Sequence, residues 1–412
     1  MKSLIVPSIE IPEMMSGAKL RSAMTVLPAY DDSTHRESQA VRLMRLSDLY
    51  RLYIPSDMSV EIYSKLYLAL LRSLQKKGTI AAVKQTYQNN RMIQGQDYRG
   101  IIGGSDSFTI IGTSGIGKSS AISRTVDLMT ERRVLEMEET LVVPCVTVQC
   151  PFDSSVKGLL LEILRKVDEV LESRYYTAAI RARATTDMLI GSVSQVALNH
   201  IGLLIVDEIQ NVVNAKSGRS LIGSLTQLIN NSGISIGMVG TPECIPFFEQ
   251  AMQLARRSVG LQYSGMAFDD AFEEFCKTVF DYQYTKHRTE ITPAVISWLY
   301  EHSAGVASVV VSLIHDAQEI AILNGREALD LSSLCESYDK RMSLLHSYIQ
   351  PTITTGKQTS RTKKTVPVTS VCTAENVSDD IYIAELAKKA KTESLDMVAL
   401  LKEGFPIEEV AI

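Results

Sequence analysis

A glycine-rich segment, Gly112-Thr-Ser-Gly-Ile-Gly-Lys-Ser119, constrains this chain more than any other feature of its sequence. The segment follows an apolar run at residues 107–112 and opens a stretch with helical spacing. In such a loop the backbone N–H groups close around phosphate oxygens, and the start of the following helix adds positive potential. The pattern therefore predicts a strand, a phosphate-binding loop and a helix in succession.

Each position of this loop has an expected role in binding a nucleotide. We expect Lys118 to reach the β and γ phosphates, and the Ser119 hydroxyl to bind Mg²⁺. The alternative is a glycine-rich turn without a ligand, which the flanking strand and helix disfavour. The residues expected to contact the nucleotide are Gly112, Thr113, Ser114, Gly115, Ile116, Gly117, Lys118, Ser119 and Ser120.

A second apolar run, Leu203–Val206, ends in two adjacent carboxylates. We expect Asp207 to hold Mg²⁺ through its water shell and Glu208 to polarise the attacking water. A solvated strand end is the alternative interpretation. The long gap between the loop and this run leaves room for an extra strand, so the two strands need not be neighbours in the sheet. That is the arrangement of AAA+ ATPases.

Two further features extend the predicted site. The run 234–239 ends in Gly240-Thr241-Pro242, so Thr241 is a candidate sensor near the γ-phosphate or the attacking water; a turn-forming Thr before Pro explains the residue equally well. Arg256 and Arg257 lie beyond a predicted helix, where a guanidinium could reach a neighbouring subunit's γ-phosphate. A solvated arginine pair is the alternative there.

Four apolar runs alternate with helical stretches, at residues 107–112, 141–148, 203–206 and 234–239. This alternation predicts a parallel sheet covered by helices on both faces, and so an α/β core. A helix is expected to precede the core, within residues 59–87. Downstream the pattern becomes wholly helical, and we expect a small lid with helices at 269–281, 292–303, 306–324 and 330–347.

The expected organisation has five parts. They are an N-terminal arm at 1–58, the ATPase core with its preceding helix at 59–265, a helical lid at 266–350, a basic linker at 351–370, and an acidic tail with short helices at 371–412. Residues 1–37 show no steady period and suggest an extended arm laid over a neighbouring surface. We expect the C-terminal tail to be flexible, with the linker solvated.

The composition limits the functions that the chain can have. Lys and Arg total 42 against 47 Asp and Glu, a net charge of −5, so any contact with nucleic acid must be a local patch. The 6 cysteines form no Cys-x-x-Cys pair, and Cys145 and Cys150 should be free thiols on opposite faces of a strand. Free thiols and the absence of a long apolar run predict a cytoplasmic protein with no membrane contact.

These motifs resemble those of the TnsC family, the AAA+ regulators of transposons with a heteromeric transposase, including CRISPR-associated relatives. The resemblance spans residues 35–325. It is carried by GTSGIGKS, by GLLIVDEIQNV at 202–212, by the following KSGRS, by VGTPE at 239–243 and by ARRSVG at 255–260. Arg256 and Arg257 match the family's paired arginines. Gln210 belongs to the same motif as Glu208, but the sequence suggests no physical role for it.

The resemblance implies an AAA+ P-loop NTPase core with a helical lid, and slow, regulatory ATP hydrolysis. It implies that ATP-bound subunits form a ring or helical filament on double-stranded DNA. A target-selection protein would recruit them, and the assembly would engage the transposase subunits. The lid departs from the pattern of many AAA+ proteins, because the run Gly305–Val311 contains no arginine for the nucleotide.

Several basic residues are candidates for contacts with the DNA backbone. Such contacts would be sequence-neutral and sensitive to salt. Individually these residues are ordinary surface charges, so several would have to act together. The candidates on predicted loops or helix ends are Lys157, Arg181, Arg183, Lys216 and Arg219.

The arm contains a second group of arginines, Arg36, Arg42, Arg45 and Arg51. They would lie near the adenine, line a subunit contact or occupy a solvated helix face.

Two other functions remain compatible with the sequence. One is a different AAA+ DNA machine, such as a helicase loader, which would have the same ATP site and another partner. The other is a scaffold in which nucleotide binding opens a protein-binding surface without DNA or appreciable hydrolysis. Glu208 argues against the scaffold, because a scaffold needs no carboxylate to activate water.

Overall fold

The computed structural model describes residues 11–77, 79–94, 107–131, 134–137, 140–214, 218–250 and 259–342. The chain divides into two units, residues 1–353 and 354–412, and every described residue belongs to the first. The expected linker at 351–370 and tail at 371–412 lie outside the described residues. The five-part division of the chain therefore stays a prediction.

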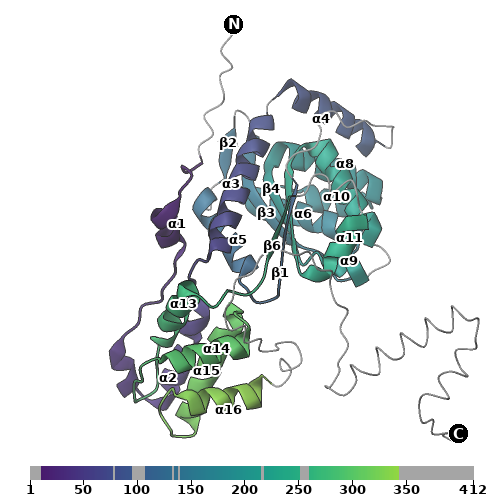
Figure 1. Cartoon of the computed structure of the whole chain (residues 1–412). Coiled ribbons are helices and arrows are strands. Elements are labelled where there is room, and N and C mark those ends of the chain that lie inside the picture. The colour runs from purple at the N-terminus through teal and green to yellow at the C-terminus, as the bar shows by residue number, and fades with distance from the viewer. Residues whose placement is uncertain are drawn as a thin grey trace, which may run out of the picture. The chain divides into compact units, whose positions relative to one another are not determined.

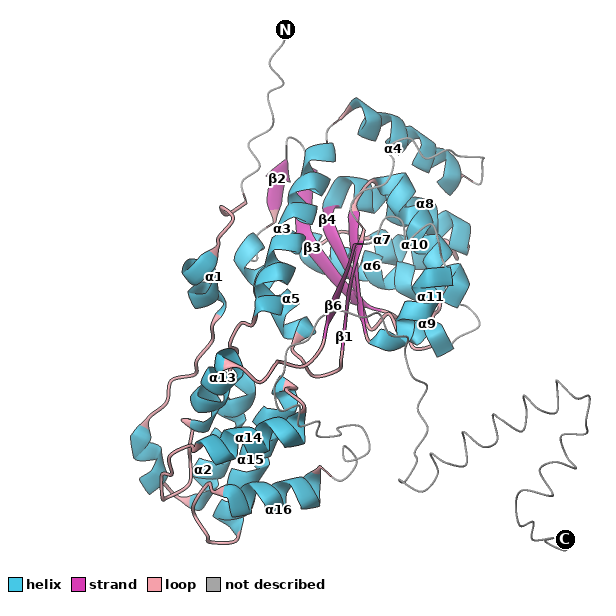
Figure 2. Cartoon of the chain, in the orientation of Figure 1, coloured by secondary structure: helices cyan, strands magenta, loops and turns pink. Residues whose placement is uncertain are grey.

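The core contains a six-stranded mixed sheet (Figure 2). Its strands are β1 (Phe108–Gly112), β2 (Leu135–Met137), β3 (Thr140–Gln149), β4 (Ile201–Asp207), β5 (Ser235–Gly240) and β6 (Val259–Tyr263). The order is β2-β3-β4-β5-β1-β6, and all neighbours are parallel except β2 and β3. The four strands that the sequence predicted, β1, β3, β4 and β5, are parallel, as expected. β2, which the sequence did not predict, is an antiparallel edge strand, because too few residues separate it from β3 for a crossover.

The four predicted strands are confirmed within a few residues at each end, and their order matters for the site. β5 lies between β1 and β4, with Ile110 opposite Val239 and Leu204 opposite Ile236. The phosphate-loop strand and the acidic strand are thus not neighbours, but the strand between them is β5, which follows the acidic strand in the chain. The strand from the gap before the acidic strand, β3, lies on the other side of β4. Because these strands are parallel, Gly112, Asp207 and Gly240 all end at one edge of the sheet.

Helices cover both faces of the sheet (Figure 1). One face packs against α3 (Asp57–Lys76) and α5 (Lys118–Thr130), and the other against α6 (Val156–Leu171), α8 (Thr186–His200) and α10 (Gly218–Ser232). The core also contains α7 (Tyr175–Arg181), α9 (Asn211–Asn214), η3 (Pro242–Cys244) and α11 (Ile245–Gln250). The helix expected within 59–87 is α3, which ends at Lys76, and a second helix that the sequence did not predict, α4 (Ile80–Ile93), follows it.

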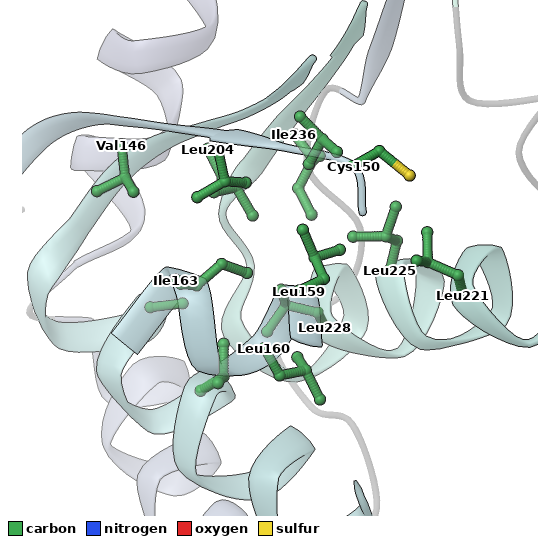
Figure 3. Close-up of a cluster of buried hydrophobic side chains, with 14 of the residues drawn as sticks. Val146, Cys150, Leu159, Leu160, Ile163, Leu204, Leu221, Leu225, Leu228 and Ile236 are labelled. Carbon is green, nitrogen blue, oxygen red and sulfur yellow. The ribbon is translucent and has the colours of Figure 1, made fainter. Parts of the chain in front are cut away.

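Figure 3 shows the apolar cluster between the sheet and the second helical layer. Val146, Leu204 and Ile236 point from three strands toward α6 and α10. Cys150 belongs to this cluster, whereas Cys145 packs on the opposite side of the sheet with the α3 and α5 layer. Both thiols are free, as predicted. Burial raises the pKa of Cys145 to about 12 and that of Cys150 to about 11, so neither is a reactive thiolate.

The described residues of the lid form four helices, at the places that the sequence predicted. They are α13 (Asp270–Phe280), α14 (Pro293–Ser303), α15 (Ala307–Leu323) and α16 (Leu331–Arg341). Three of them begin where a side chain caps the helix: Asp269, Thr292 and Asp330 each accept a hydrogen bond from a backbone N–H in the first turn. The part of α16 expected beyond residue 342 lies outside the described residues.

The N-terminal arm is not extended throughout, contrary to expectation. It forms α1 (Gly17–Met24), η1 (Asp32–Arg36), α2 (Gln39–Arg45) and η2 (Leu46–Arg51). Leu20 and Met24 of α1 pack in the core with α3 and α5, whereas Leu46 and Leu49 belong to the apolar cluster of the lid. Tyr30 Oη donates to Gln283 O at 2.7 Å. The arm therefore begins on the core, crosses to the lid and returns at α3.

Arg42 has the least expected position in the arm. Its guanidinium is 1% exposed and forms an ion pair with Glu327 of the lid. The solvated-face alternative is therefore wrong for Arg42, although Arg45 and Arg51 remain largely exposed and pair with Asp48. The short helix α2 can bury an arginine because tertiary packing, more than its own sequence pattern, decides which face of so short a helix is buried.

Within the described residues, no single helix has the length and apolar character needed to cross a membrane. The pair α14 and α15 meets these criteria together, with a bend of 119° between them.

Candidate nucleotide-binding site

A cavity of about 390 Å³ lies where the predicted motifs meet. It is lined by Ser114–Ser120 of the phosphate loop, Asp207, Glu208 and Gln210 after β4, and Gly240 and Thr241 after β5. The arm and the lid complete the wall. The convergence follows from the sheet order, because parallel strands present their carboxyl ends at one edge.

The loop conformation depends on its glycines. Gly115 and Gly117 have φ of +83° and +98°, in the left-handed region that favours glycine. A Cβ on Gly112 would lie 2.7 Å from Ile116 Cδ1 and 2.9 Å from Tyr263 O, so the close approach of β6 also requires a glycine here. α5 starts directly after Gly117 without a side-chain cap. Its first N–H groups are therefore left for an anion.

Lys118 is held inside the loop. It is 9% exposed, and its Nζ donates to Gly112 O at 2.7 Å and to Thr113 O at 3.0 Å. Burial lowers the pKa of Lys118, while the nearby Asp207 and Glu208 act in the opposite direction. Two neutral carbonyls solvate a partly desolvated ammonium less well than a phosphate would. The position therefore suits Lys118 to bind a phosphate.

Ser119 and Asp207 are brought together from opposite ends of the site. Ser119 Oγ donates to Asp207 Oδ2 at 2.9 Å, and the N–H of Glu208 donates to Asp207 Oδ1 at 2.8 Å. A hydroxyl and a carboxylate are hard oxygen ligands of the kind that Mg²⁺ prefers. The pair thus fits a divalent cation bound between the loop and β4.

Glu208 adopts a backbone conformation that is rare for its type. Its φ is +57°, and its side chain is exposed to the cavity. Left-handed non-glycine residues cluster at functional sites, because the surrounding structure must hold them there. The side chain of Gln210 donates to Glu208 Oε2 and accepts from the N–H of Thr241. Sequence reasoning found no role for Gln210, since only the fold places β5 beside it.

Thr241 lies at the end of β5 with its hydroxyl oxygen buried. This oxygen has no hydrogen-bond partner within the described residues, and it does not cap the η3 turn. A turn-forming role would use the hydroxyl in such a cap. The geometry therefore favours the sensor interpretation of Thr241.

The lid contacts the phosphate loop through backbone. Ser308 N, in the first turn of α15, donates to Gly115 O at 3.1 Å. No arginine of the lid lines the cavity, and Lys118 is the single cation among the described lining residues. Arg256 and Arg257 lie outside the described residues, so their expected role stays a prediction.

The sequence did not predict the apolar end of the cavity. It combines arm residues with lid residues: Leu49, Leu52, Ile54, Met58, Met266, Phe275 and Val311. Such a lining suits a flat, largely apolar base. The arm residues show no regular spacing of apolar residues in the sequence, because they lie on a segment that runs between the core and the lid and contacts both.

Three of the residues expected to bind DNA are exposed on the core. Lys157 lies in the first turn of α6, Arg181 ends α7, and Arg183 follows it with a φ of +49°. None of the three lines the cavity, and none has an ion pair within the described residues. The side chain of Arg219 and all of Lys216 lie outside the described residues.

Comparison with known proteins finds a similarity over the central part of the chain. Residues 102–263 match the family model described as "Bacterial TniB protein". This segment contains the phosphate loop, Asp207, Glu208 and Thr241. The match confirms the resemblance to TnsC-like AAA+ ATPases that the sequence motifs indicated. No curated protein matches the chain.

Solved structures show similar but distant folds. The ORC1 protein of Aeropyrum pernix in complex with DNA is 13% identical, with a TM-score of 0.42, over 63% of this chain and 64% of that chain. Drosophila ORC bound to DNA is 11% identical, with a TM-score of 0.44, over 97% and 85% of the two chains. The ADP form of Aeropyrum pernix ORC2 is 17% identical, with a TM-score of 0.40, over 63% and 67%. At these values none of them bears on what the chain does.

Proposed function

We propose that this chain, a TnsC-like AAA+ ATPase, regulates DNA transposition. It oligomerises on double-stranded DNA as a ring or helical filament, and it links target-site selection to the recruitment and activation of the transposase. One observation supports this most directly. The phosphate loop, the Ser119–Asp207 pair and Glu208 meet in one cavity, inside the segment that matches the TniB family.

In the proposed site, residues 112–120 hold the phosphates, and Ser119 and Asp207 hold Mg²⁺. Bound Mg-ATP supplies a cleavable phosphoanhydride and a cation that offsets its charge. Lys118 exchanges its two carbonyl acceptors for phosphate oxygens. Glu208 orients a water and accepts its proton, and the unpaired hydroxyl of Thr241 donates near the γ-phosphate.

The proposed site is completed by a second subunit. Lys118 is the single cation among the described lining residues, whereas phosphoryl transfer is accelerated by further positive charge on the transferred group. We assign that charge to Arg256 or Arg257 of a neighbouring copy. ATP binding would then favour assembly, and hydrolysis would favour disassembly.

The proposed DNA contacts are Lys157, Arg181, Arg183, Lys216 and Arg219. The exposure of Lys157, Arg181 and Arg183 supports this assignment, since none is engaged in an ion pair within the described part of the chain. A protein with a net charge of −5 binds DNA through such a local group rather than through its overall field.

Electron microscopy of the full chain with a random DNA duplex tests the proposal. The experiment compares a slowly hydrolysed ATP analogue with ADP, and the wild type with Lys118→Ala. We expect rings or filaments only for the wild type with the analogue and DNA. Monomers under every condition, together with intact nucleotide binding, would instead support a nucleotide-switched scaffold. Purified transposase, target selector and replicative helicase are then offered to the assemblies, because capture of the helicase alone would indicate a helicase loader.

A further inference from the structure

The side chain of Gln210 connects two residues on different strand ends. Its Nε2 donates to Glu208 Oε2, and its Oε1 accepts from Thr241 N at 3.3 Å. Glu208 follows β4 and Thr241 follows β5, so a single amide spans the gap between neighbouring strands. All three residues line the cavity.

The chemistry of the two partners fixes the orientation of this amide. A carboxylate only accepts and a backbone N–H only donates, so the reversed amide would face both partners with repulsion. The surrounding backbone is also fixed. Ile209 is fully buried, and its N–H donates to Val239 O at 2.9 Å. A Cβ on Gly240 would lie 2.9 Å from Gln210 Oε1, which shows how closely β5 approaches this side chain.

Glu208 has little else to orient it. Its side chain is exposed and its φ is +57°. Among the described residues, Gln210 is the one side chain that donates a hydrogen bond to the carboxylate of Glu208. A general base that is free to rotate spends little time in a productive geometry. Whatever holds this carboxylate therefore affects the rate of the reaction that it serves.

We propose that Gln210 is a positioning residue for ATP hydrolysis, which orients the Glu208 carboxylate and ties it to the backbone of Thr241. If Thr241 moves when its hydroxyl binds a phosphate, the side chain of Gln210 transmits that movement to the carboxylate of Glu208. In this proposal Gln210 acts through Glu208 rather than on the substrate. The inference rests on the proposed function of Glu208 as the base.

Two substitutions separate the contacts of Gln210. Gln210→Leu removes both hydrogen bonds at similar volume. Gln210→Glu retains an acceptor for Thr241 N, but it replaces the donor to Glu208 with a second negative charge. If orientation of Glu208 is what matters, both variants lose activity. If Gln210 only braces the end of β5, Gln210→Glu retains activity.

The measurements are kcat and KM for ATP hydrolysis by the full chain with duplex DNA, and the Kd of a fluorescent ATP analogue. We expect kcat to fall at least about tenfold in both variants, because a positioned base contributes on the order of 10²–10⁴-fold. Kd should stay within about twofold, since the phosphate loop is untouched. Asn211→Ala is the matched control. It deletes a neighbouring hydrogen bond, Asn211 Nδ2 to Cys150 O at 2.9 Å, and should leave kcat unchanged.

A double-mutant cycle gives the decisive result. In a Glu208→Gln background, Gln210→Leu should lower kcat by no more than about twofold, because residues that act as a unit are not additive. Equal losses in both backgrounds, or wild-type kcat in Gln210→Glu, would overturn the proposal. A wild type without ATP hydrolysis above that of Lys118→Ala would instead contradict the proposed function, so the two failures are distinguishable.

Discussion

Arg42 and Glu327, 285 residues apart in the chain, form a bidentate ion pair with N–O distances of 2.6 and 2.7 Å. Arg42 also donates to Tyr284 O at 2.9 Å, and the N–H of Lys286 donates to Glu327 Oε2 at 3.3 Å. Each charge is thus compensated although the pair is almost fully buried. The pair fastens α2 of the arm to the lid, beside the segment that closes the apolar end of the cavity.

Removal of one partner of this pair should destabilise the lid. We expect Arg42→Met to cost about 3–5 kcal/mol in the free energy of unfolding, because it leaves the buried carboxylate with the largely exposed ammonium of Lys286, 3.7 Å away, as its remaining counter-charge. Denaturant unfolding, with hydrogen exchange to locate the change, measures the effect. The control is Arg45→Met, which should cost less than about 1 kcal/mol, because Arg45 is exposed and Asp48 keeps its ion pair with Arg51. Equal effects of the two variants would contradict a special role for the buried pair.

The same pair predicts how stability depends on pH. Burial alone would raise the pKa of Glu327, but hydrogen bonds from Arg42 and Lys286 N outweigh it and lower the pKa below its ordinary value of 4.5. A lowered pKa stabilises the folded state above pH 4.5, and this contribution is lost as the pH falls through the folded value. Wild type should therefore lose more stability on acidification than Glu327→Gln, in unfolding curves that run from about pH 6 to well below pH 4.5. Parallel curves would contradict the assignment.

Lys118 should be essential for binding the triphosphate. Lys118→Ala should weaken the binding of ATP at least about tenfold, since a hydrogen bond to a charged group contributes about 1.5–3 kcal/mol. Titration with a fluorescent ATP analogue measures this. Lys277→Ala is the control, because Lys277 is exposed, forms an ion pair with Glu273 and does not line the cavity. Unchanged affinity in Lys118→Ala would show that the lysine stays on its two carbonyl acceptors.

Glu208 should act in hydrolysis rather than in binding. Glu208→Gln retains the size of the side chain and removes its basicity, so we expect ATP to bind normally while kcat falls on the order of 10²–10⁴-fold. The variant should accumulate assemblies with ATP that the wild type forms only with a slowly hydrolysed analogue. Steady-state ATPase assays and electron microscopy check both expectations. Normal hydrolysis by this variant would mean that another group activates the water.

The exposed arginines near α7 should contribute to DNA affinity without sequence preference. Arg181→Ala combined with Arg183→Ala should weaken binding similarly for all duplexes, and it should reduce the slope of log affinity against log salt by about 2. Fluorescence anisotropy at several salt concentrations measures both quantities. Arg165→Ala is the matched control, because Arg165 is ion-paired with Glu162 and Glu169. The same slope in the double variant would remove these residues from the interface.

Some features of the site could be predicted from local sequence because they depend on local chemistry. The loop from Gly112 to Ser119 needs glycines for its backbone conformation and a lysine and a hydroxyl for its ligands, and those requirements are written in consecutive residues. Asp207 and Glu208 could be assigned because a buried apolar run ends directly before them. The strands and the lid helices could be predicted because the spacing of apolar residues within each element indicates its type.

Other features could not be predicted because they depend on which elements meet. Nothing near Arg42 shows that Glu327 will neutralise it, and the short helix α2 alone would place an arginine in solvent. The role of Gln210 appears only when β5 packs beside β4 and brings the Thr241 N–H within reach.

The sequence by itself thus determined the phosphate loop, its acidic partners and the α/β order of the core, since each is marked by a pattern of nearby residues in the chain. Only the tertiary structure decided that the arm closes the apolar end of the cavity, that Arg42 is buried and that Gln210 joins Glu208 to Thr241. These contacts depend on free energies of packing and desolvation between distant segments, which no local pattern encodes.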